Sequence, residues 1–300
     1  MVGIANLMFS EIRQAILPIA LRNLKRRGDL ERAGLLIESL AKHWRDSQPF
    51  QVLIVAPRSD VSLLRSSLPH FANIEVSVRS ESDFFGPFSR FYVLPGWYRQ
   101  QMVKLQVPAM LGFGGFLTLD SDVCCVGDFD ARTFVENGRA LSRWEPKHHH
   151  PWWKNAAAIV GVPYDARTHG LSVTPNILHG ELTRQTLAHF RTGPMIDEMT
   201  SLCSWVLRKI GGIAWTEYSL YTSVAELKGN LFDYHVHWDP SYFHDTQLFS
   251  EHTCVWGADD FERLVQLPGG TDPGGKFIIV QSHARIPLER VRDYCLSFAG

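Results

Sequence analysis

The chain has 300 residues, of which 45% are hydrophobic, and its 30 Lys and Arg residues nearly balance its 31 Asp and Glu residues, leaving a formal charge of -1. This composition is sufficient for a large buried core, and it excludes the strongly basic surface that is typical of nucleic-acid binding. Five cysteines without zinc-finger spacing favour free thiols in a reducing compartment, and no apolar run is long enough to span a bilayer. We therefore expect a cytoplasmic protein.

The first 47 residues are predicted to form a helical extension. Apolar residues recur at helical spacing over residues 8–27 and again over residues 29–45. Basic residues gather at the end of the first stretch, namely Arg22, Lys25, Arg26 and Arg27. A helix of this kind usually packs on the domain that follows it. The alternative is a peripheral contact with the inner face of a membrane, where basic side chains meet anionic lipids.

Strands and helices alternate along the rest of the chain. Apolar or alternating segments predict strands over residues 51–56, 73–78, 115–123, 171–178 and 277–280, and a further strand-like alternation covers residues 233–238. Helices are predicted over residues 96–111, 181–190, 194–210 and 216–228, and a loop over residues 145–154. This alternation predicts one α/β domain over residues 48–300 with a mostly parallel sheet.

Two aspartates lie at the end of the predicted strand over residues 115–123. Its apolar residues lead directly into Asp120, Ser121 and Asp122. Open α/β sheets place their ligands at the carboxyl ends of strands, and two carboxylates there suit Mg²⁺ or Mn²⁺, which in turn neutralises a substrate diphosphate. The alternative is a polar turn in which the aspartates cap backbone groups.

Three separate segments of the chain form a recognisable pattern through their order and spacing. They are Gly-Trp-x-x-Gln-Gln-x-x-Lys-Leu at residues 96–105, Asp-x-Asp at residues 120–122 and Thr-Glu-Tyr at residues 216–218. Together they resemble a group of bacterial glycosyltransferase-like domains of the GT-A fold, over about residues 51–285. The resemblance implies a single GT-A-like α/β domain whose central, mostly parallel sheet is flanked by helices.

The resemblance also implies a reaction. Such enzymes transfer a sugar from a nucleotide sugar, here expected to be a UDP-sugar, to a hydroxyl group of a polysaccharide or glycoconjugate. A metal ion on the Asp-x-Asp stabilises the charge that builds on the leaving diphosphate. We expect Asp122 to be a direct ligand of Mn²⁺ or Mg²⁺, and Asp120 to bind through water or to hold the ribose. His283 is the expected third ligand, and a surface or capping histidine is its alternative.

Polar residues on the helix before the aspartates are expected to contact the donor. Arg99 or Lys104 would bind the diphosphate, and Gln100, which shares a helix face with Lys104, would bind a sugar hydroxyl. A solvated charged face is the alternative for each. The turn between the first strand and the helix that follows it usually contacts the nucleotide in a doubly wound sheet, and here it follows the strand predicted over residues 51–56. Further donor contacts are therefore expected from Ser121 and from the turn residues Ala56, Pro57, Arg58 and Asp60.

A general base and an acceptor site complete the expectations. Glu217, in the first turn of its predicted helix, would deprotonate the acceptor hydroxyl, with Asp197 and Glu198 as substitutes. Its alternative role is a favourable charge at a helix end. In the predicted loop, Trp152 and Trp153 would stack on an acceptor sugar.

Two other histidines and two other classes of function stay open. His235 and His237 lie two apart in the strand-like segment and form a weak rival metal site. The same aspartate pair would also serve a nucleotidyltransferase or a metal phosphohydrolase. A non-catalytic carbohydrate-binding domain is the third alternative, because a fold does not by itself fix a function.

Overall fold

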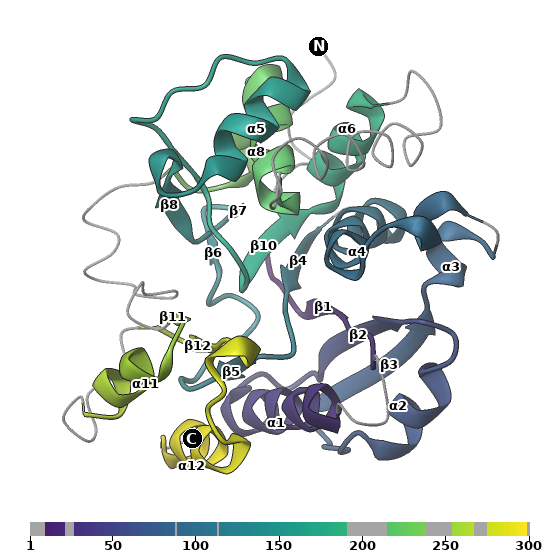
Figure 1. Ribbon diagram of the computed structural model, residues 1–300, viewed down its shortest axis with the longest axis vertical. Coiled ribbons are helices and arrows are strands. Elements are labelled where there is room, and N and C mark those ends of the chain that lie inside the picture. Colours follow the sequence, from purple (N-terminus) through teal and green to yellow (C-terminus); the bar gives the residue numbers. More distant parts are fainter. Residues whose placement is uncertain are drawn as a thin grey trace.

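The computed structural model describes residues 10–21, 27–87, 89–112, 114–190, 215–237, 254–266 and 275–298. Its centre is a five-stranded sheet in the order β10-β4-β1-β2-β3 (Figure 1). The strands are β1 (Gln14–Pro18), β2 (Phe50–Ala56), β3 (Ile74–Ser80), β4 (Gly115–Thr118) and β10 (Asn176–His179). β1 pairs in parallel with β2 and β4, β2 pairs in parallel with β3, and β10 runs antiparallel to β4. The predicted α/β class with a mostly parallel sheet flanked by helices is confirmed.

Helices cover both faces of this sheet (Figure 1). One face carries α1 (Arg27–His43) and α2 (Val61–Ser67). The other carries α4 (Gly96–Leu111), on which α6 (Gly180–His189) and α8 (Glu217–Lys228) pack, and α5 (Pro151–Val160) packs on α8. Among the described residues, no helix is long and apolar enough to cross a membrane.

The core reflects the alternation of side chains along the strands. Leu17 of β1 belongs to the cluster that includes α1, whereas Ile16 belongs to the cluster beneath α4 and α8, and both residues are 0% exposed. A strand that is buried on both faces reads as a continuous apolar run, as β1 and β2 do.

The helix predicted over residues 8–27 is wrong where the structure describes that segment, because Gln14–Pro18 forms β1. Its apolar residues fit a helix and a strand equally well, and pairing along both edges decides in favour of the strand. β1 occupies the middle of the sheet, so this part of the chain is integral to the domain and not an appendage. The helix predicted over residues 29–45 is confirmed as α1.

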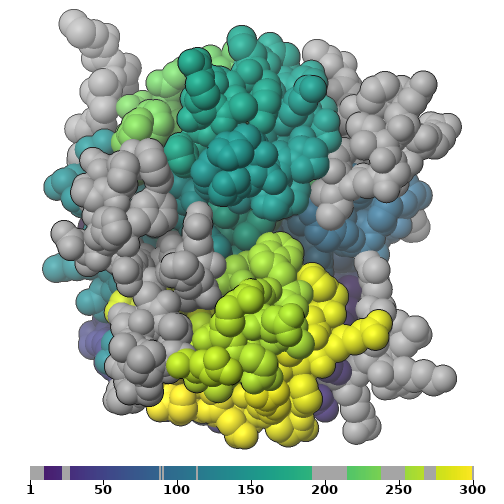
Figure 2. All heavy atoms as spheres, turned by 60° about the vertical axis from the view of Figure 1, so that its left-hand side comes forward, coloured from purple at the N-terminus to yellow at the C-terminus, as the bar shows by residue number. Residues whose placement is uncertain are grey.

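A second, three-stranded sheet is joined to the first through the aspartates. It contains β11 (Cys254–Val255), β12 (Phe277–Val280) and β5 (Val123–Cys125), in that order. β5 packs on α1, and the sheet shares a core with α11 (Ala258–Val265) and α12 (Leu288–Ser297). Figure 2 shows these C-terminal segments gathered in the lower half of one face. Asp120 and Asp122 therefore lie where the chain leaves the main sheet and enters the smaller one.

Short elements complete the domain. They are α3 (Ser82–Phe85), η2 (Arg90–Val93), β6 (Val135–Glu136), β7 (Arg139–Ala140), β8 (Trp144–Pro146), η3 (Lys147–His149), β9 (His169–Leu171), α9 (Leu231–Tyr234) and η5 (Ser282–Ala284).

Most predicted elements agree with these. The helices over residues 96–111, 181–190 and 216–228 and the strands over residues 51–56, 73–78 and 277–280 are confirmed. The loop predicted over residues 145–154 instead contains the end of β8, the short helix η3 and the start of α5, and the strand-like segment 233–238 begins inside α9. The strand predicted over residues 171–178 is interrupted between β9 and β10, and the helix predicted over residues 194–210 lies outside the described residues.

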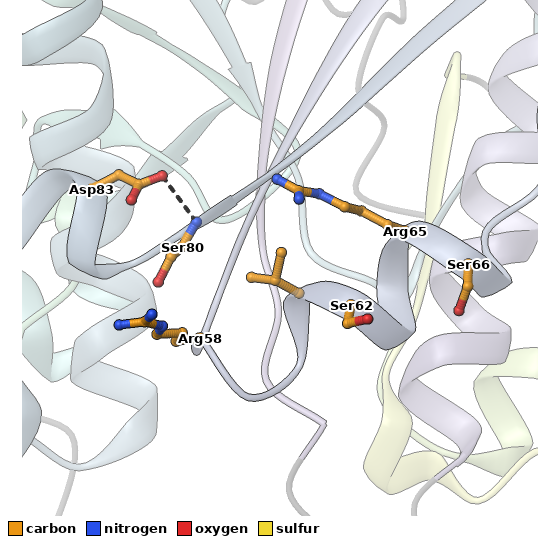
Figure 3. Close-up of a pocket in the computed structure, with 7 residues that line it drawn as sticks. Arg58, Ser62, Arg65, Ser66, Ser80 and Asp83 are labelled. Atoms are coloured by element: carbon orange, nitrogen blue, oxygen red, sulfur yellow. Dashed lines mark hydrogen bonds between the residues drawn. The ribbon is translucent and has the colours of Figure 1, made fainter.

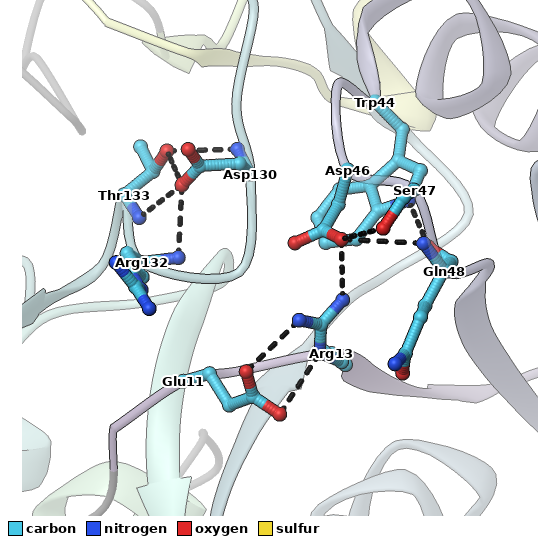
Figure 4. Close-up of polar contacts among 9 residues, drawn as sticks. All are labelled: Glu11, Arg13, Trp44, Asp46, Ser47, Gln48, Asp130, Arg132 and Thr133. Atoms are coloured by element: carbon cyan, nitrogen blue, oxygen red, sulfur yellow. Dashed lines mark hydrogen bonds and ion pairs between the residues drawn. The ribbon is translucent and has the colours of Figure 1, made fainter.

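Ion pairs close the amino-terminal edge of the main sheet (Figure 4). The Arg13 guanidinium lies 2.9 Å from Glu11 and 2.7 Å from Asp46. Hydrogen bonding to Arg13 is the main cause that lowers the pKa of Asp46, to about 2. The start of β1 is thereby tied to the loop that follows α1, at the edge opposite to the aspartate pair.

Candidate functional site

The carboxyl edge of the main sheet gathers the ends of four parallel strands. After β2, Asp60 accepts a hydrogen bond at 2.8 Å from the backbone N–H of Leu21, which follows β1. After β3, the backbone N–H of Glu81 donates to the carbonyl of Ala56 at 2.8 Å. After β4, the chain enters Asp120. This edge therefore brings together the strand ends from which donor contacts are predicted.

A buried lysine lies behind Asp120. The Lys104 ammonium, whose side chain is 2% exposed, lies 2.8 Å from Asp120 Oδ1 and 3.0 Å from Glu217 Oε1. It also donates to Thr174 Oγ1 at 2.7 Å. Burial acts to lower the pKa of Lys104, but the two carboxylates outweigh it and raise that pKa well above its ordinary value. Lys104 is therefore a charged group held inside the protein.

The two carboxylates around Lys104 differ in exposure. The side chain of Asp120 is 38% exposed, whereas that of Glu217 is 2% exposed. Burial raises the pKa of Glu217, and Lys104 opposes that rise. No group in the described part of the chain makes a hydrogen bond to Glu217 Oε1, but its separation of 3.0 Å from the Lys104 ammonium is that of a close ion pair. Asp120 faces the solvent side of this cluster and Glu217 its interior.

Hydroxyl groups extend the cluster to β4 and β10. Tyr218 OH lies 2.9 Å from Thr174 Oγ1 and 2.6 Å from Thr118 Oγ1. Thr118 in turn donates to the carbonyl of Asn176 at 2.7 Å. Sequence reasoning missed Thr174 and Tyr218, although Tyr218 stands inside the Thr-Glu-Tyr pattern next to the residue chosen as a base. These contacts fix Lys104 relative to the main sheet.

The start of α8 is fixed by α4 and by its own cap. Gln101 Oε1 accepts a hydrogen bond at 3.0 Å from the backbone N–H of Glu217. Thr216 caps the helix by accepting from the Ser219 N–H at 3.0 Å, and the Ser219 hydroxyl accepts from the Thr216 N–H at 2.9 Å. The three segments of the sequence pattern thus meet at a single point, where Gln101, Lys104, Asp120 and Glu217 are in contact.

Asp122 stands at the junction of the two sheets. Its backbone carbonyl accepts from Val280 at 2.9 Å, and its carboxylate accepts from the Ser282 N–H at 3.4 Å. Burial first and the charge of Asp120 second raise the pKa of Asp122 to about 7, while Ser282 and Arg32 act to lower it. Asp122 is thus a carboxylate whose negative charge is only partly compensated.

His283 follows Ser282 in η5 and is exposed. Its ring lies 6.1 Å from that of Trp256, which is 46% exposed. The pairing of β12 with β5 therefore brings the C-terminal segment beside Asp122. Trp256 is an exposed aromatic residue there that sequence reasoning missed. Within the described ranges, no three His, Cys, Asp or Glu side chains stand close enough together to hold a metal ion.

The other predicted donor residues occupy different positions along the edge. Arg99 pairs with the buried Glu81, and its guanidinium lies over the rings of Phe91 and Tyr92 at 5.2 and 5.5 Å. Gln100 is partly buried on the same helix. Arg99 is therefore already oriented by a carboxylate and two aromatic rings.

A cavity of about 650 Å³ lies beside the turn after β2 (Figure 3). Arg58, which is exposed, lines it together with Ser80 at the end of β3. From α2 it is lined by Ser62 and by Arg65, which donates to the carbonyl of Val78 at 2.7 Å. Of the predicted turn residues, Ala56 is 0% exposed and lies outside this lining, as do Pro57 and Asp60.

The two tryptophans predicted to bind an acceptor have different environments. Trp153 is 1% exposed and donates to Glu145 Oε1 at 2.7 Å. Trp152 is partly buried and stacks on His150 with ring centroids 3.8 Å apart. Trp152 therefore keeps an accessible part, whereas the ring of Trp153 belongs to the core.

The rival histidine pair does not form a shared site. His235 is 0% exposed, and its ring nitrogens lie 2.7 Å from Ser142 Oγ and 2.7 Å from Tyr221 OH. Burial lowers the pKa of His235 to about 3. His237 is exposed, so the two side chains occupy different environments. Asp197 and Glu198, the substitute bases, lie outside the described residues.

Arg143 is a further charged residue that the sequence analysis did not single out. It is 6% exposed, and its backbone is held by Ser172 and Asn176. Its side chain lies against the thiol of Cys254, whose pKa burial raises and Arg143 lowers. An arginine just before a short strand has no distinctive sequence signal, and its burial became visible only through the pairing of distant segments.

Comparisons with known proteins place the chain in a family. The apo crystal structure of mouse xyloside xylosyltransferase 1 is similar with a TM-score of 0.45 and 12% identity, over 92% of this chain and 100% of that one. No curated protein matches the sequence. The model of a family of unknown function, DUF6492, matches residues 11–299. The chain therefore belongs to the family DUF6492.

Proposed function

We propose that the chain is a metal-dependent glycosyltransferase, which moves a sugar from a nucleotide-sugar donor, expected to be a UDP-sugar, to a hydroxyl group of a polysaccharide or glycoconjugate. One observation carries the proposal: Asp120 and Asp122 lie together after β4, where burial first and the charge of Asp120 second raise the pKa of Asp122 to about 7. Two neighbouring carboxylates whose negative charge is only partly compensated support a divalent cation as a further partner. The order of the three sequence segments supports the reaction class.

The two carboxylates are suitable ligands for such a cation. Two carboxylates offer hard oxygen ligands, and His283, beside the Ser282 that contacts Asp122, offers an imidazole. Asp120 and Asp122 would hold the ion. His283, the predicted third ligand, would have to move toward them, because no three such side chains lie close enough together in the described part of the chain. When bound, Mn²⁺ or Mg²⁺ supplies positive charge that stabilises a leaving diphosphate.

The chain's own residues have separate tasks in this proposal. Arg58 and Arg99 would contact the donor, and Arg99 is pre-oriented by Glu81, which reduces the entropy that binding costs. Trp152 would contact the acceptor. The role of general base requires the Glu217 carboxylate to leave Lys104 and reach an acceptor hydroxyl.

The reaction is tested by incubating the protein with a panel of nucleotide sugars and glycan acceptors, with Mn²⁺, with Mg²⁺ or with a chelator. Release of free nucleoside diphosphate that depends on the metal supports sugar transfer or donor hydrolysis. Release of pyrophosphate would replace the proposal with a nucleotidyltransferase, and release of inorganic phosphate with a phosphohydrolase. Binding without turnover across the panel would indicate a carbohydrate-binding domain.

The aspartate pair is tested by Asp122→Asn. We expect this variant to fold and to lose at least about 10²-fold in transfer, because a neutral amide does not provide the charge that a divalent ion requires. Asp165→Asn is the matched control, since Asp165 is ion-paired with Arg167 at the surface. Transfer by Asp122→Asn at the rate of the control would remove Asp122 from the site.

A further inference from the structure

The Lys104 ammonium is surrounded by oxygen atoms inside the protein. A lysine ammonium carries three N–H donors. Three oxygens lie within 3.0 Å of it, on Asp120, Glu217 and Thr174. The Lys104 side chain is only 2% exposed, so these three contacts enclose its ammonium. Binding of a diphosphate by Lys104 would require it to give up one of these contacts.

The charges of this cluster do not cancel. One ammonium faces two carboxylates, so Lys104, Asp120 and Glu217 together carry about one negative charge when all three are ionised. Glu217 is sealed from solvent and Asp120 is not. A buried ammonium needs a close counter-charge, and the interior carboxylate provides it. The remaining negative charge is therefore carried by Asp120, on the accessible side.

The same helix fixes Glu217 twice. Gln101 and Lys104 are three residues apart on α4 and so share a face. Gln101 holds the Glu217 backbone at 3.0 Å, and Lys104 holds its carboxylate at 3.0 Å. Because Glu217 is held through its backbone and through its carboxylate, it is suited to be a fixed structural charge. Movement of the carboxylate toward an acceptor would break the ion pair with Lys104.

We propose that Lys104 and Glu217 form a positioning pair for Asp120. Glu217 supplies the interior counter-charge, so that Lys104 orients Asp120 without neutralising it and leaves the carboxylate able to bind a divalent cation. This inference rests on the proposed function, and it assigns Glu217 a role through Lys104 in place of direct proton transfer from the acceptor.

The test is the affinity of the full chain for Mn²⁺ alone and for Mn²⁺ with UDP. In Glu217→Gln, Asp120 is the one carboxylate left to neutralise Lys104. We therefore expect the Mn²⁺ affinity to weaken by about tenfold or more. Glu226→Gln is the matched control, because it removes the same charge from the same helix, where Glu226 pairs with Lys147. It should bind Mn²⁺ as the unaltered protein does.

A double variant separates charge balance from general damage. Lys104→Met with Glu217→Gln removes one positive and one negative charge, so Asp120 regains its net charge. We expect it to bind Mn²⁺ more tightly than Glu217→Gln alone, which a merely structural role would not produce. Glu217→Asp, which keeps the counter-charge, should stay within about threefold of the unaltered protein.

Three results decide the inference. Unchanged Mn²⁺ affinity in Glu217→Gln together with lost transfer would overturn it and make Glu217 the general base. A double variant that binds no better than Glu217→Gln, or a Glu217→Asp variant as weak as Asp122→Asn, would also overturn it. Absence of Mn²⁺ binding by the unaltered protein would instead reject the proposed function, and the inference with it.

Discussion

Two adjacent tryptophans that share a sequence context have opposite structural roles. Trp153 packs inside the domain, where Gly170 makes room for it: a Cβ at residue 170 would stand 2.1 Å from the Trp153 ring. Its indole N–H satisfies the buried Glu145. Trp152 also reaches Glu145, at 3.3 Å, but its ring stacks on His150 and remains partly accessible. One indole is a core residue and the other is available to a ligand.

This difference predicts distinct effects of truncation. Trp153→Ala should lower the free energy of unfolding by about 3–5 kcal/mol, because it leaves a large cavity and removes a donor from Glu145. Trp152→Ala should cost less than about 1.5 kcal/mol and should act on acceptor KM if Trp152 contacts the acceptor. Urea denaturation of the two variants checks the first part, and equal losses in both would contradict it.

Sequence reasoning placed the aspartates correctly relative to the main sheet. They stand at a strand end, as an apolar run followed by two carboxylates suggests, whereas their contact with β12 became visible only in the structure. The burial of Lys104 and Glu217 was not predictable in the same way. Both side chains resemble solvent-facing charges on helices, and only contacts between residues 70 to 116 positions apart reveal that they are interior.

At the scale of elements, a buried polar chain connects α8, α9 and β10. Tyr221 OH contacts the ring of His235 at 2.7 Å and accepts from the His179 N–H at 3.1 Å. Ser142 contacts the other ring nitrogen of His235, and Arg184 is the charged residue that acts on His179. Burial lowers the pKa of His235 to about 3 and that of His179 to about 4. Both imidazoles are therefore neutral inside the fold.

These two histidines predict a loss of stability in acid. Unfolded histidine titrates near pH 6.5, so from there down to about pH 4 the unfolded chain binds protons that the folded chain does not. The stabilising contribution is complete above pH 6.5, and each histidine should remove about 1.4 kcal/mol per pH unit as the pH falls. His235→Gln should reduce that slope, measured by urea unfolding at several pH values, whereas the exposed His148→Gln should not. Identical slopes in all three proteins would contradict the prediction.

Elements with clear end signals were predictable, and β1 was not. Thr216 caps α8 as its sequence suggests, and α4 covers the predicted residues 96–111. For β1 the local sequence led to a helix prediction, although its apolar residues fit a strand equally well. The decision came from neighbouring strands, one of which lies about a hundred residues further along the chain.

At the scale of the whole molecule, the position of β1 makes the N-terminal part essential. Ile16 is 0% exposed in the middle of the central strand. Ile16→Asp buries a charge without a partner and should abolish cooperative unfolding or lower its free energy by more than about 4 kcal/mol. Leu63→Asp, at a residue that is 42% exposed, is the control. Circular dichroism during urea titration gives the answer, and a chain that tolerated Ile16→Asp would have to fold without β1.

The ties between α4 and α8 have a consequence for the newly made protein. Gln101 and Glu217 are 116 residues apart. At ribosomal speeds of about 5–20 residues per second, roughly 6 to 23 s separate their synthesis. During that interval Lys104 can meet Asp120 but not its second counter-charge. An unfinished chain that ends before Glu217 therefore lacks both contacts that join α4 to the start of α8, so these two helices can lock together only late in synthesis.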